Sequence, residues 1–119
     1  MTLFAAHLIL PFPFTRYDVQ PAQADDVANT VAGVSGPRLL VGDFNAATWG
    51  AIVARPRERA GMNVLTGPGG SWPTFLPRQM GIPIDHVMAS PELALLSRRL
   101  LTVTGSDHRA VLTEIAFTN

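Results

Sequence analysis

Residues 38–45 read Arg-Leu-Leu-Val-Gly-Asp-Phe-Asn, an apolar run that ends in a carboxylate and an amide. The run predicts a short strand over residues 38–41, which delivers Asp43 at its carboxyl end. Asp43 and Asn45 are two residues apart, so their side chains point toward the same side. Such a pair suits a hard divalent cation and its water, or a phosphate oxygen. An Asx turn that closes the strand explains these two residues equally well when they are taken alone.

A second motif, Gly-Ser-Asp-His, occupies residues 105–108, which we expect to form a loop. The alternation of apolar and polar residues after it predicts a final strand over residues 109–117. Asp107 is a hard-metal ligand beside the imidazole of His108, and a protonated imidazole can stabilise charge that develops on a phosphoryl group. A polar turn before an edge strand is the commoner explanation for this motif by itself.

A third carboxylate, Asp85, begins a strand predicted over residues 84–90. A carboxylate in this position can hold a distant histidine in one tautomer, as base-orienting groups do. A single aspartate at a strand end is more often a cap or an ion-pair partner, so Asp85 alone favours no function.

Three further side chains are weaker candidates. His7 lies in an apolar run over residues 3–10 that predicts a buried strand, where a lone histidine is usually a core residue. Trp72 and Phe75 could stack on a base or an aryl group. For both aromatic residues, packing in the core is the simpler expectation.

The remaining segments predict a mixed architecture in which strands outnumber helices. A helix is expected over residues 21–34, because Pro21 suits a first turn and valines recur on one face. A second helix is expected over residues 46–60, broken or kinked by Pro56. The other expected segments are a loop over residues 11–17, a short strand over 63–65, a long Gly- and Pro-rich loop over 66–83 and a strand over 93–103.

Composition limits the classes of function. The 119 residues are 47% hydrophobic and 15% charged, with a formal net charge of zero, which indicates a folded chain with apolar surface to spare. Because proteins that bind duplex DNA usually carry a basic excess, there is no strong nucleic-acid-binding signal. The chain has no cysteine, which excludes disulfides and thiolate chemistry. We expect a soluble protein without a signal peptide or membrane span, and its compartment is not indicated.

In their order along the chain, residues 42–45, 83–87 and 105–111 resemble the motifs of the endonuclease/exonuclease/phosphatase superfamily, whose fold is DNase I-like. His7, with the prolines after it, is similar to that family's histidine motif at a strand end. Residues 71–73, Ser-Trp-Pro, resemble the tryptophan–proline loop of its bacterial members. The resemblance extends from about residue 7 to residue 111, and the three ordered motifs together are specific.

The resemblance implies a metal and water side of the site. Asp43 and Asn45 would bind or orient the attacking water and the phosphate, with Asp43 near the metal. Asp107 is similar to the family's C-terminal metal ligand. Asp43, Asn45 and Asp107 are therefore the expected ligands of a divalent cation, Mg²⁺ or Mn²⁺, with Zn²⁺ as a further candidate if imidazoles also bind it.

The resemblance also implies a histidine side. His108 matches the catalytic histidine that contacts the phosphoryl group, and Asp85 matches the carboxylate that orients it. His7 matches a histidine that hydrogen-bonds the scissile phosphate, and Trp72 would flank the substrate pocket. No role is implied for His86.

One departure from the family's pattern concerns its principal metal-binding glutamate, which lies in the N-terminal half of the fold, before the position that matches His7. The glutamates here are Glu58, Glu92 and Glu114. The chain therefore resembles the C-terminal half of the family's sandwich. We expect one truncated α+β domain over residues 1–119, with a mixed, mainly antiparallel sheet, helices on one face, and a homodimer that completes the fold.

The leading hypothesis is a divalent-metal-dependent phosphodiesterase or phosphatase that acts on small phosphoesters rather than on duplex DNA. The alternative is a catalytically inactive remnant that folds, dimerises and acts as an interaction module.

Overall fold

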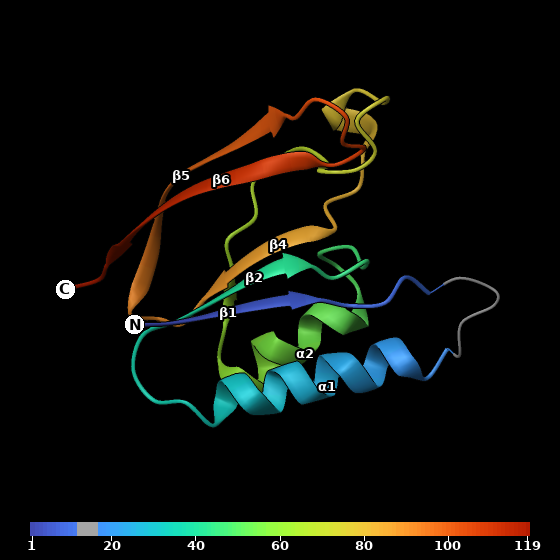
Figure 1. Ribbon diagram of the computed structural model, residues 1–119. Coiled ribbons are helices and arrows are strands. Elements are labelled where there is room, and N and C mark those ends of the chain that lie inside the picture. The colour runs from blue at the N-terminus through green and yellow to red at the C-terminus, as the bar shows by residue number, and fades with distance from the viewer. Residues whose placement is uncertain (12–16) are drawn as a thin grey trace.

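The computed structural model describes residues 1–11 and 17–119, and its two helices lie on one face of a four-stranded sheet with the order β1-β2-β4-β3 (Figure 1). A β5-β6 hairpin lies beside β4, on the side away from β1 and β2, and continues the row of strands. The fold is thus of the expected α+β class, with helices on one face of a mixed sheet. The elements are β1 (Thr2–His7), α1 (Val19–Ala32), β2 (Arg38–Asp43), α2 (Ala51–Ala60), β3 (Asn63–Val64), a 3₁₀ turn (Arg78–Met80), β4 (Asp85–Ala89), β5 (Leu93–Thr102) and β6 (Arg109–Phe117).

The register of the central sheet brings the polar strand ends together. β1 and β2 are parallel, connected through α1, and pair His7 with Asp43. β4 runs antiparallel to β2 and pairs Asp85 with the same Asp43. Because residues directly opposite one another point to the same face, the side chains of these three residues lie together, where β1 and β2 end and β4 begins.

Gly42 allows β2 to approach β1 closely. Its φ is +149°, and a Cβ atom built on it would lie 1.7 Å from the carbonyl oxygen of Ala6. No other residue can occupy this position without moving one of the two strands. The residue before Asp43 is therefore fixed by the backbone of the neighbouring strand.

The two helices pack on the sheet through a continuous apolar core. Asp25 of α1 accepts ion-pair contacts from Arg55 and Arg59 of α2, at 2.6 and 3.0 Å, which join the helices on their outer side. α2 begins later than predicted, at Ala51, and continues through Pro56 to Ala60, so the expected break is wrong. Packing explains its continuity, because Val53, Pro56 and Ala60 are all buried. The buried core cluster consists of Leu8, Ala24, Val31, Leu40, Phe44, Val53, Ala60, Met62 and Met88.

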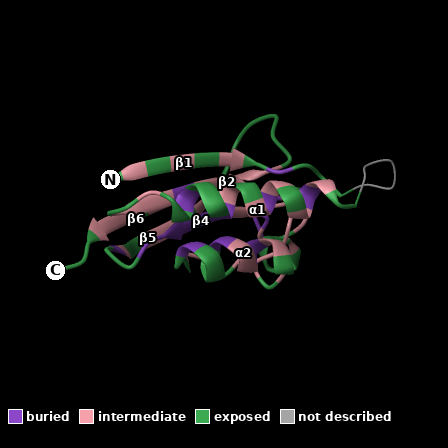
Figure 2. Ribbon diagram, turned by 90° about the horizontal axis from the view of Figure 1, so that it is seen from below, coloured by how far each residue is buried: buried purple, intermediate pink, exposed green. Residues whose placement is uncertain are grey.

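Exposed apolar side chains remain on the side of the sheet opposite the helices. In β1, Phe4 and Ala6 pack against the core, whereas Leu3 on the other face is 59% exposed. Partly buried and exposed residues alternate along β1 (Figure 2). Leu112 and Phe117 of β6 are also exposed, and because they are five residues apart on this strand they point to opposite faces of the hairpin. Among the described residues, none of the helices is both long enough and apolar enough to span a bilayer.

The strand predicted over residues 3–10 ends at His7. Residues 12–16 of the predicted loop, with one of the prolines that follow His7, lie outside the described residues. Within the long loop over residues 66–83, regular structure is limited to the 3₁₀ turn and an isolated bridge between Trp72 and Ile82.

Candidate active site

The carboxylate of Asp43 is held at the end of β2 by an Asx turn. The backbone N–H of Asn45 donates to Oδ1 of Asp43 at 2.8 Å. Asn45 has a φ of +48°, a left-handed conformation that asparagine adopts more readily than most residues. Its side-chain amide donates to the carbonyl oxygen of Leu8 at 2.7 Å, and buried Gln20 donates to the carbonyl oxygens of Phe44 and Asn45. The turn that was predicted as an alternative to a functional site is therefore present, and it orients Asp43.

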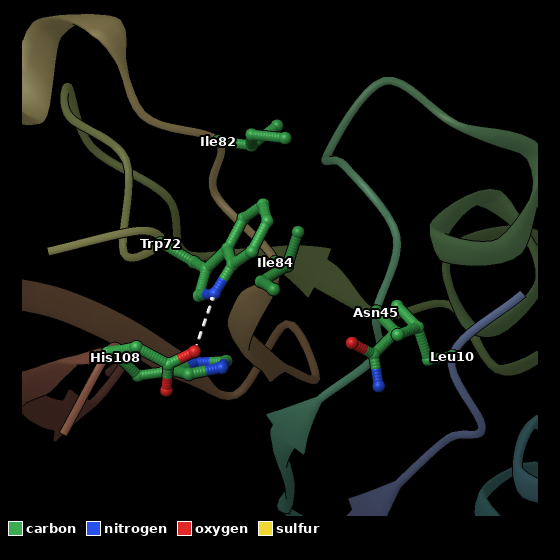
Figure 3. A pocket seen from close by; sticks show the side chains of 7 residues that line it. Leu10, Asn45, Trp72, Ile82, Ile84 and His108 are labelled. Atoms are coloured by element: carbon green, nitrogen blue, oxygen red, sulfur yellow. Dashed lines mark hydrogen bonds between the residues drawn. The ribbon is translucent and has the colours of Figure 1, made fainter. Parts of the chain in front are cut away.

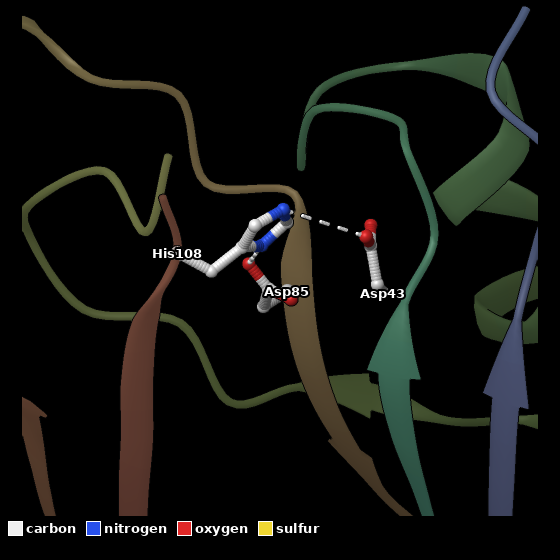
Figure 4. A group of neighbouring side chains, drawn as sticks. All are labelled: Asp43, Asp85 and His108. Atoms are coloured by element: carbon white, nitrogen blue, oxygen red, sulfur yellow. Dashed lines mark hydrogen bonds and ion pairs between the residues drawn. The ribbon is translucent and has the colours of Figure 1, made fainter. Parts of the chain in front are cut away.

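His108 is paired with Asp85 (Figure 4). Nδ1 of His108 lies 2.8 Å from Oδ2 of Asp85, and the ring points from the start of β6 toward the start of β4. The hydroxyl of Ser106 accepts a hydrogen bond from the backbone N–H of His108. The buried Ser71 hydroxyl accepts hydrogen bonds from the backbone N–H groups of Ile84 and Asp85, both at 3.2 Å. Both members of the pair are thus fixed by neighbouring hydroxyl groups.

The other ring nitrogen of His108 faces Asp43. Nε2 of His108 lies 3.8 Å from Oδ2 of Asp43, and Nε2 of His7 lies 3.6 Å from the same oxygen. His7 is not a core residue, because its side chain is 77% exposed. One carboxylate oxygen therefore stands between two imidazoles at an open edge of the sheet.

The acidic surroundings change the protonation of His108. Burial is the largest single influence and lowers the pKa of the imidazole, but the hydrogen bond to Asp85 and the charges of Asp85, Asp43 and Asp107 together outweigh it. The net result is a pKa above the ordinary value of histidine. The arrangement therefore favours the protonated imidazole, which can donate to an anionic ligand.

Asp43, Asp85 and His108 also form a group that could hold a metal. Their ligand atoms lie within 4.8 Å of one another, and it is the one such group of three in the described part of the chain. Two carboxylates and an imidazole fit a divalent cation such as Mg²⁺ or Mn²⁺. Asp107 lies outside this group, and its role as a ligand stays a prediction.

Trp72 and Asp107 contact each other beside this cluster. The indole N–H of Trp72 donates to Oδ2 of Asp107 at 3.0 Å (Figure 3). Trp72 is partly buried, whereas Phe75 is 81% exposed, so core packing is the wrong interpretation for Phe75. A cavity of about 270 Å³ lies next to the indole, and it is lined by Leu10, Asn45, Trp72, Ile82, Ile84, Asp107 and His108.

Arg109 fixes the loop that carries Trp72, a role that the sequence did not indicate. Within the described residues, its guanidinium donates to backbone carbonyl oxygens alone, and the backbone N–H of Arg109 donates to the carbonyl oxygen of Ser71 at 2.7 Å. No pattern of side chains in a sequence indicates contacts between a guanidinium and backbone carbonyl oxygens. In this sequence, the position of Arg109 directly after His108 was the one available signal. The acceptors of the guanidinium are Gly70 at 3.1 Å, Pro73 at 3.3 Å, Thr74 at 3.3 Å and Leu76 at 2.6 Å.

His86, for which no role was implied, supports the loop after β2. Its ring is buried, Nε2 lies 2.7 Å from the carbonyl oxygen of Ala46, and the ring meets Phe44 edge-on at 5.4 Å. Burial lowers the pKa of His86, which favours the neutral ring whose Nε2–H donates to Ala46. This side chain is part of the core that holds residues 44–46.

In a comparison with protein families, the model described as the Endonuclease/Exonuclease/phosphatase family matches residues 5–108, which include Asp43, Asp85 and His108. In a comparison with curated proteins, no sequence matches the chain.

Solved structures with the same fold are about twice as long. The catalytic domain of human Nocturnin with bound sulfate is 22% identical with a TM-score of 0.69, and the match covers 96% of this chain and 46% of that one. A mannosyl-6-phosphatase of Bacteroides thetaiotaomicron is 18% identical with a TM-score of 0.67, covering 97% and 51%. Beta toxin of Staphylococcus aureus is 11% identical with a TM-score of 0.60, covering 92% and 50%. The chain spans about half the length of these proteins.

Proposed function

The chain belongs to the endonuclease/exonuclease/phosphatase family, and from that premise we propose that it hydrolyses small phosphoesters with the help of a divalent cation. The cluster of Asp43, Asp85 and His108 carries the proposal. It offers a positioned carboxylate, an oriented imidazole and space for a phosphate at the open edge of the sheet. The zero net charge supports small substrates rather than duplex DNA.

In this proposal, one residue activates the attacking water and another stabilises the charge that develops on the phosphoryl group. Asp43 accepts a hydrogen bond from the attacking water and takes its proton. Protonated His108, held by Asp85, donates to the phosphoryl oxygens on which charge develops. The bond from the water oxygen to phosphorus forms, the bond to the ester oxygen breaks, and the departing alcohol regains a proton from solvent. His7 and Asn45 contact the phosphate from the β1 and β2 sides.

We infer that Asp43 and Asn45 hold the cation, for which Mg²⁺ and Mn²⁺ are the first candidates and Zn²⁺ a further one if an imidazole other than that of His108 also binds it. A divalent cation bound there supplies Lewis-acid stabilisation of negative charge. Asp107 can add a ligand through its other carboxylate oxygen, because only Oδ2 accepts the hydrogen bond from the Trp72 indole.

The test is hydrolysis of bis-p-nitrophenyl phosphate with Mn²⁺, with and without EDTA. We expect turnover that EDTA abolishes and that His108→Ala lowers by about 10²-fold or more. Glu58→Ala serves as the matched control, because Glu58 is exposed and distant from the site. Equal rates for the wild type and His108→Ala reject the assignment. The family membership does not favour the alternative of an inactive interaction module, and that alternative is retained only if no metal supports hydrolysis.

We also propose that a second copy of the chain covers the exposed face of the sheet. Leu3 points away from the helices on the same face as His7, so a partner seated there would border the phosphate site. The apolar side chains exposed beyond the helices are of the kind that homodimer interfaces bury.

A further inference from the structure

The cavity beside His108 is lined by chemically different groups (Figure 3). Its polar residues are Asn45, Asp107 and His108, and the phosphate is proposed to bind among them. Trp72, Ile82 and Ile84 form an apolar wall, and a fourth apolar side chain, Leu10, lies beside Asn45 on the opposite side of the cavity. A phosphoester bound at the polar wall therefore places its organic group against an apolar surface.

Trp72 presents its ring, rather than its hydrogen-bond donor, to a ligand. The indole N–H is already engaged by Oδ2 of Asp107 at 3.0 Å, so it is not available to a substrate hydroxyl. Ile82 beside it is 36% exposed, although it lies in a concave site. An aromatic ring and an aliphatic side chain left open to solvent in a cavity are suited to an apolar group.

The apolar wall is built in advance. Trp72 and Ile82 exchange two backbone hydrogen bonds, at 3.2 and 2.7 Å, and form an antiparallel bridge across the loop. The guanidinium of Arg109 holds the backbone on either side of Trp72, from Gly70 to Leu76. Because the wall is fixed before a ligand arrives, little ordering is needed for binding.

From these observations we propose that the site selects phosphoesters whose organic group is apolar and about the size of one ring, such as aryl or branched alkyl alcohols. The proposal rests on the proposed function for the place of the phosphate. A sugar of equal size would set hydroxyl groups against Trp72, Ile82 and Ile84, where they lose water without gaining partners. We expect a preference of about 10- to 100-fold for an aryl over a sugar phosphoester, the range that burial of one such group supplies.

A binding experiment tests this without turnover. Trp72 and Trp49 are the two tryptophans, and Trp49 is 76% exposed and outside the cavity, so Trp49→Phe leaves Trp72 as the reporter. Phenylphosphonate, methylphosphonate and ribose 5-phosphate are titrated with Mn²⁺ present while fluorescence and heat are recorded. We expect phenylphosphonate to bind at least about tenfold more tightly than the other two and to change the emission of Trp72. Equal affinity for the sugar phosphate, or no binding of phenylphosphonate, overturns the proposal.

A variant locates the preference in the wall. Ile82→Thr keeps the branch at Cβ but replaces the ethyl group with a hydroxyl, and we expect it to reduce the ratio of phenyl to methyl affinity by about three- to tenfold. Ile82→Leu is expected to retain the ratio. Leu96→Thr is the matched control, because Leu96 is an exposed aliphatic residue on β5 outside the cavity. A ratio that Ile82→Thr leaves unchanged contradicts the assignment of the wall.

The failure of the inference and the failure of the proposed function give different results. Selective binding of phenylphosphonate without hydrolysis of any ester supports the assignment of the apolar pocket and contradicts the proposed hydrolase activity. EDTA-sensitive hydrolysis that is faster for sugar phosphates than for aryl phosphates supports the hydrolase activity and contradicts the apolar selectivity.

Discussion

Nδ1 of His108 lies 2.8 Å from Oδ2 of Asp85, although 23 residues separate them in the sequence. The pair is joined across the start of two strands that belong to different sheets. With Nδ1 bonded to Asp85, Nε2 of His108 points toward Asp43. The carboxylate of Asp85 therefore orients the ring, and the carboxylate of Asp43 faces the second ring nitrogen.

The first expectation is that Asp85→Asn lowers turnover without unfolding the protein. The amide fills the same space but does not stabilise an imidazolium, and we expect kcat to fall by about 10²- to 10⁴-fold. Steady-state kinetics with bis-p-nitrophenyl phosphate measure the loss. Glu58→Gln makes the same chemical change on an exposed helix residue and is expected to keep wild-type rates. A fully active Asp85→Asn protein contradicts the orienting role.

The second expectation is a loss of stability in acid that depends on His86. Burial lowers the pKa of His86 in the folded state, so below its ordinary pKa the unfolded chain binds the proton more readily. The stability due to the neutral ring is fully present above a pH of about 6.5 and is lost as the pH falls from there toward the lower folded pKa.

Urea unfolding at pH 7.5 and pH 5.0 measures this difference, with His86→Gln as the comparison. The glutamine does not titrate in this range, so we expect the variant to be less stable at pH 7.5 but to lose less between the two pH values. Because His108 is present in both proteins, its own opposite contribution cancels in the comparison. Parallel pH profiles contradict the assignment.

The third expectation concerns Gly42. Gly42→Ala places a methyl group 1.7 Å from the carbonyl oxygen of Ala6, so the pairing of β1 and β2 must open. We expect the free energy of unfolding to fall by about 2 kcal/mol or more, or folding to fail. Gly36→Ala is the matched control, because Gly36 also has a positive φ, +81°, but nothing lies within 4 Å of the added Cβ. Chemical denaturation compares the two, and equal losses rule out the close approach as the cause.

The fourth expectation is that Arg109→Lys releases the loop around Trp72. A lysine ammonium does not reproduce the forked donor geometry that reaches carbonyl oxygens from Gly70 to Leu76. We expect faster proteolysis within residues 66–83 and a change in the emission of Trp72 in the Trp49→Phe background. Arg99→Lys, at an exposed position on β5, is the control. Resistance to proteolysis equal to that of the wild type contradicts the anchoring role.

The fifth expectation concerns the uncovered face of the sheet. Light scattering at micromolar concentration is expected to give the mass of two chains, and Leu3→Glu is expected to shift it to one, because a charge is costly in an apolar interface. Glu58→Lys, on the helix side, is the control. A wild-type protein that is monomeric in this range rules out the homodimer.

Sequence patterns predicted the secondary structure well where the burial of one face of an element determines the pattern. Alternation in residues 109–117 places β6 with its observed bounds, because one face of a strand packs and the other does not. The start of α2 was predicted five residues early, since residues 46–50 form turns and Gly50 is extended before the helix begins at Ala51. Helix propensity is a weak guide at such ends, where turn geometry competes.

The sequence motifs indicated three residues that the structure brings together, but they did not indicate the contacts of these residues. Asp43, Asp85 and His108 follow from their motifs, whereas their distances depend on the register that pairs β2 with β4 and on the placement of the hairpin. The hydroxyl of Ser71 and the guanidinium of Arg109 act on backbone groups. Contacts of that kind leave no complementary residue elsewhere in the sequence.

The guanidinium of Arg109 bonds to carbonyl oxygens and to no side chain of the loop over residues 70–76. The anchor therefore constrains the path of that loop and not its amino acids. An exposed side chain of that loop, such as Phe75, can be replaced without loss of the bonds that hold the loop beside His108. New residues can therefore be introduced at such exposed positions while the anchor is kept, whereas Gly70, Ser71 and Trp72 have packing or hydrogen-bonding roles of their own.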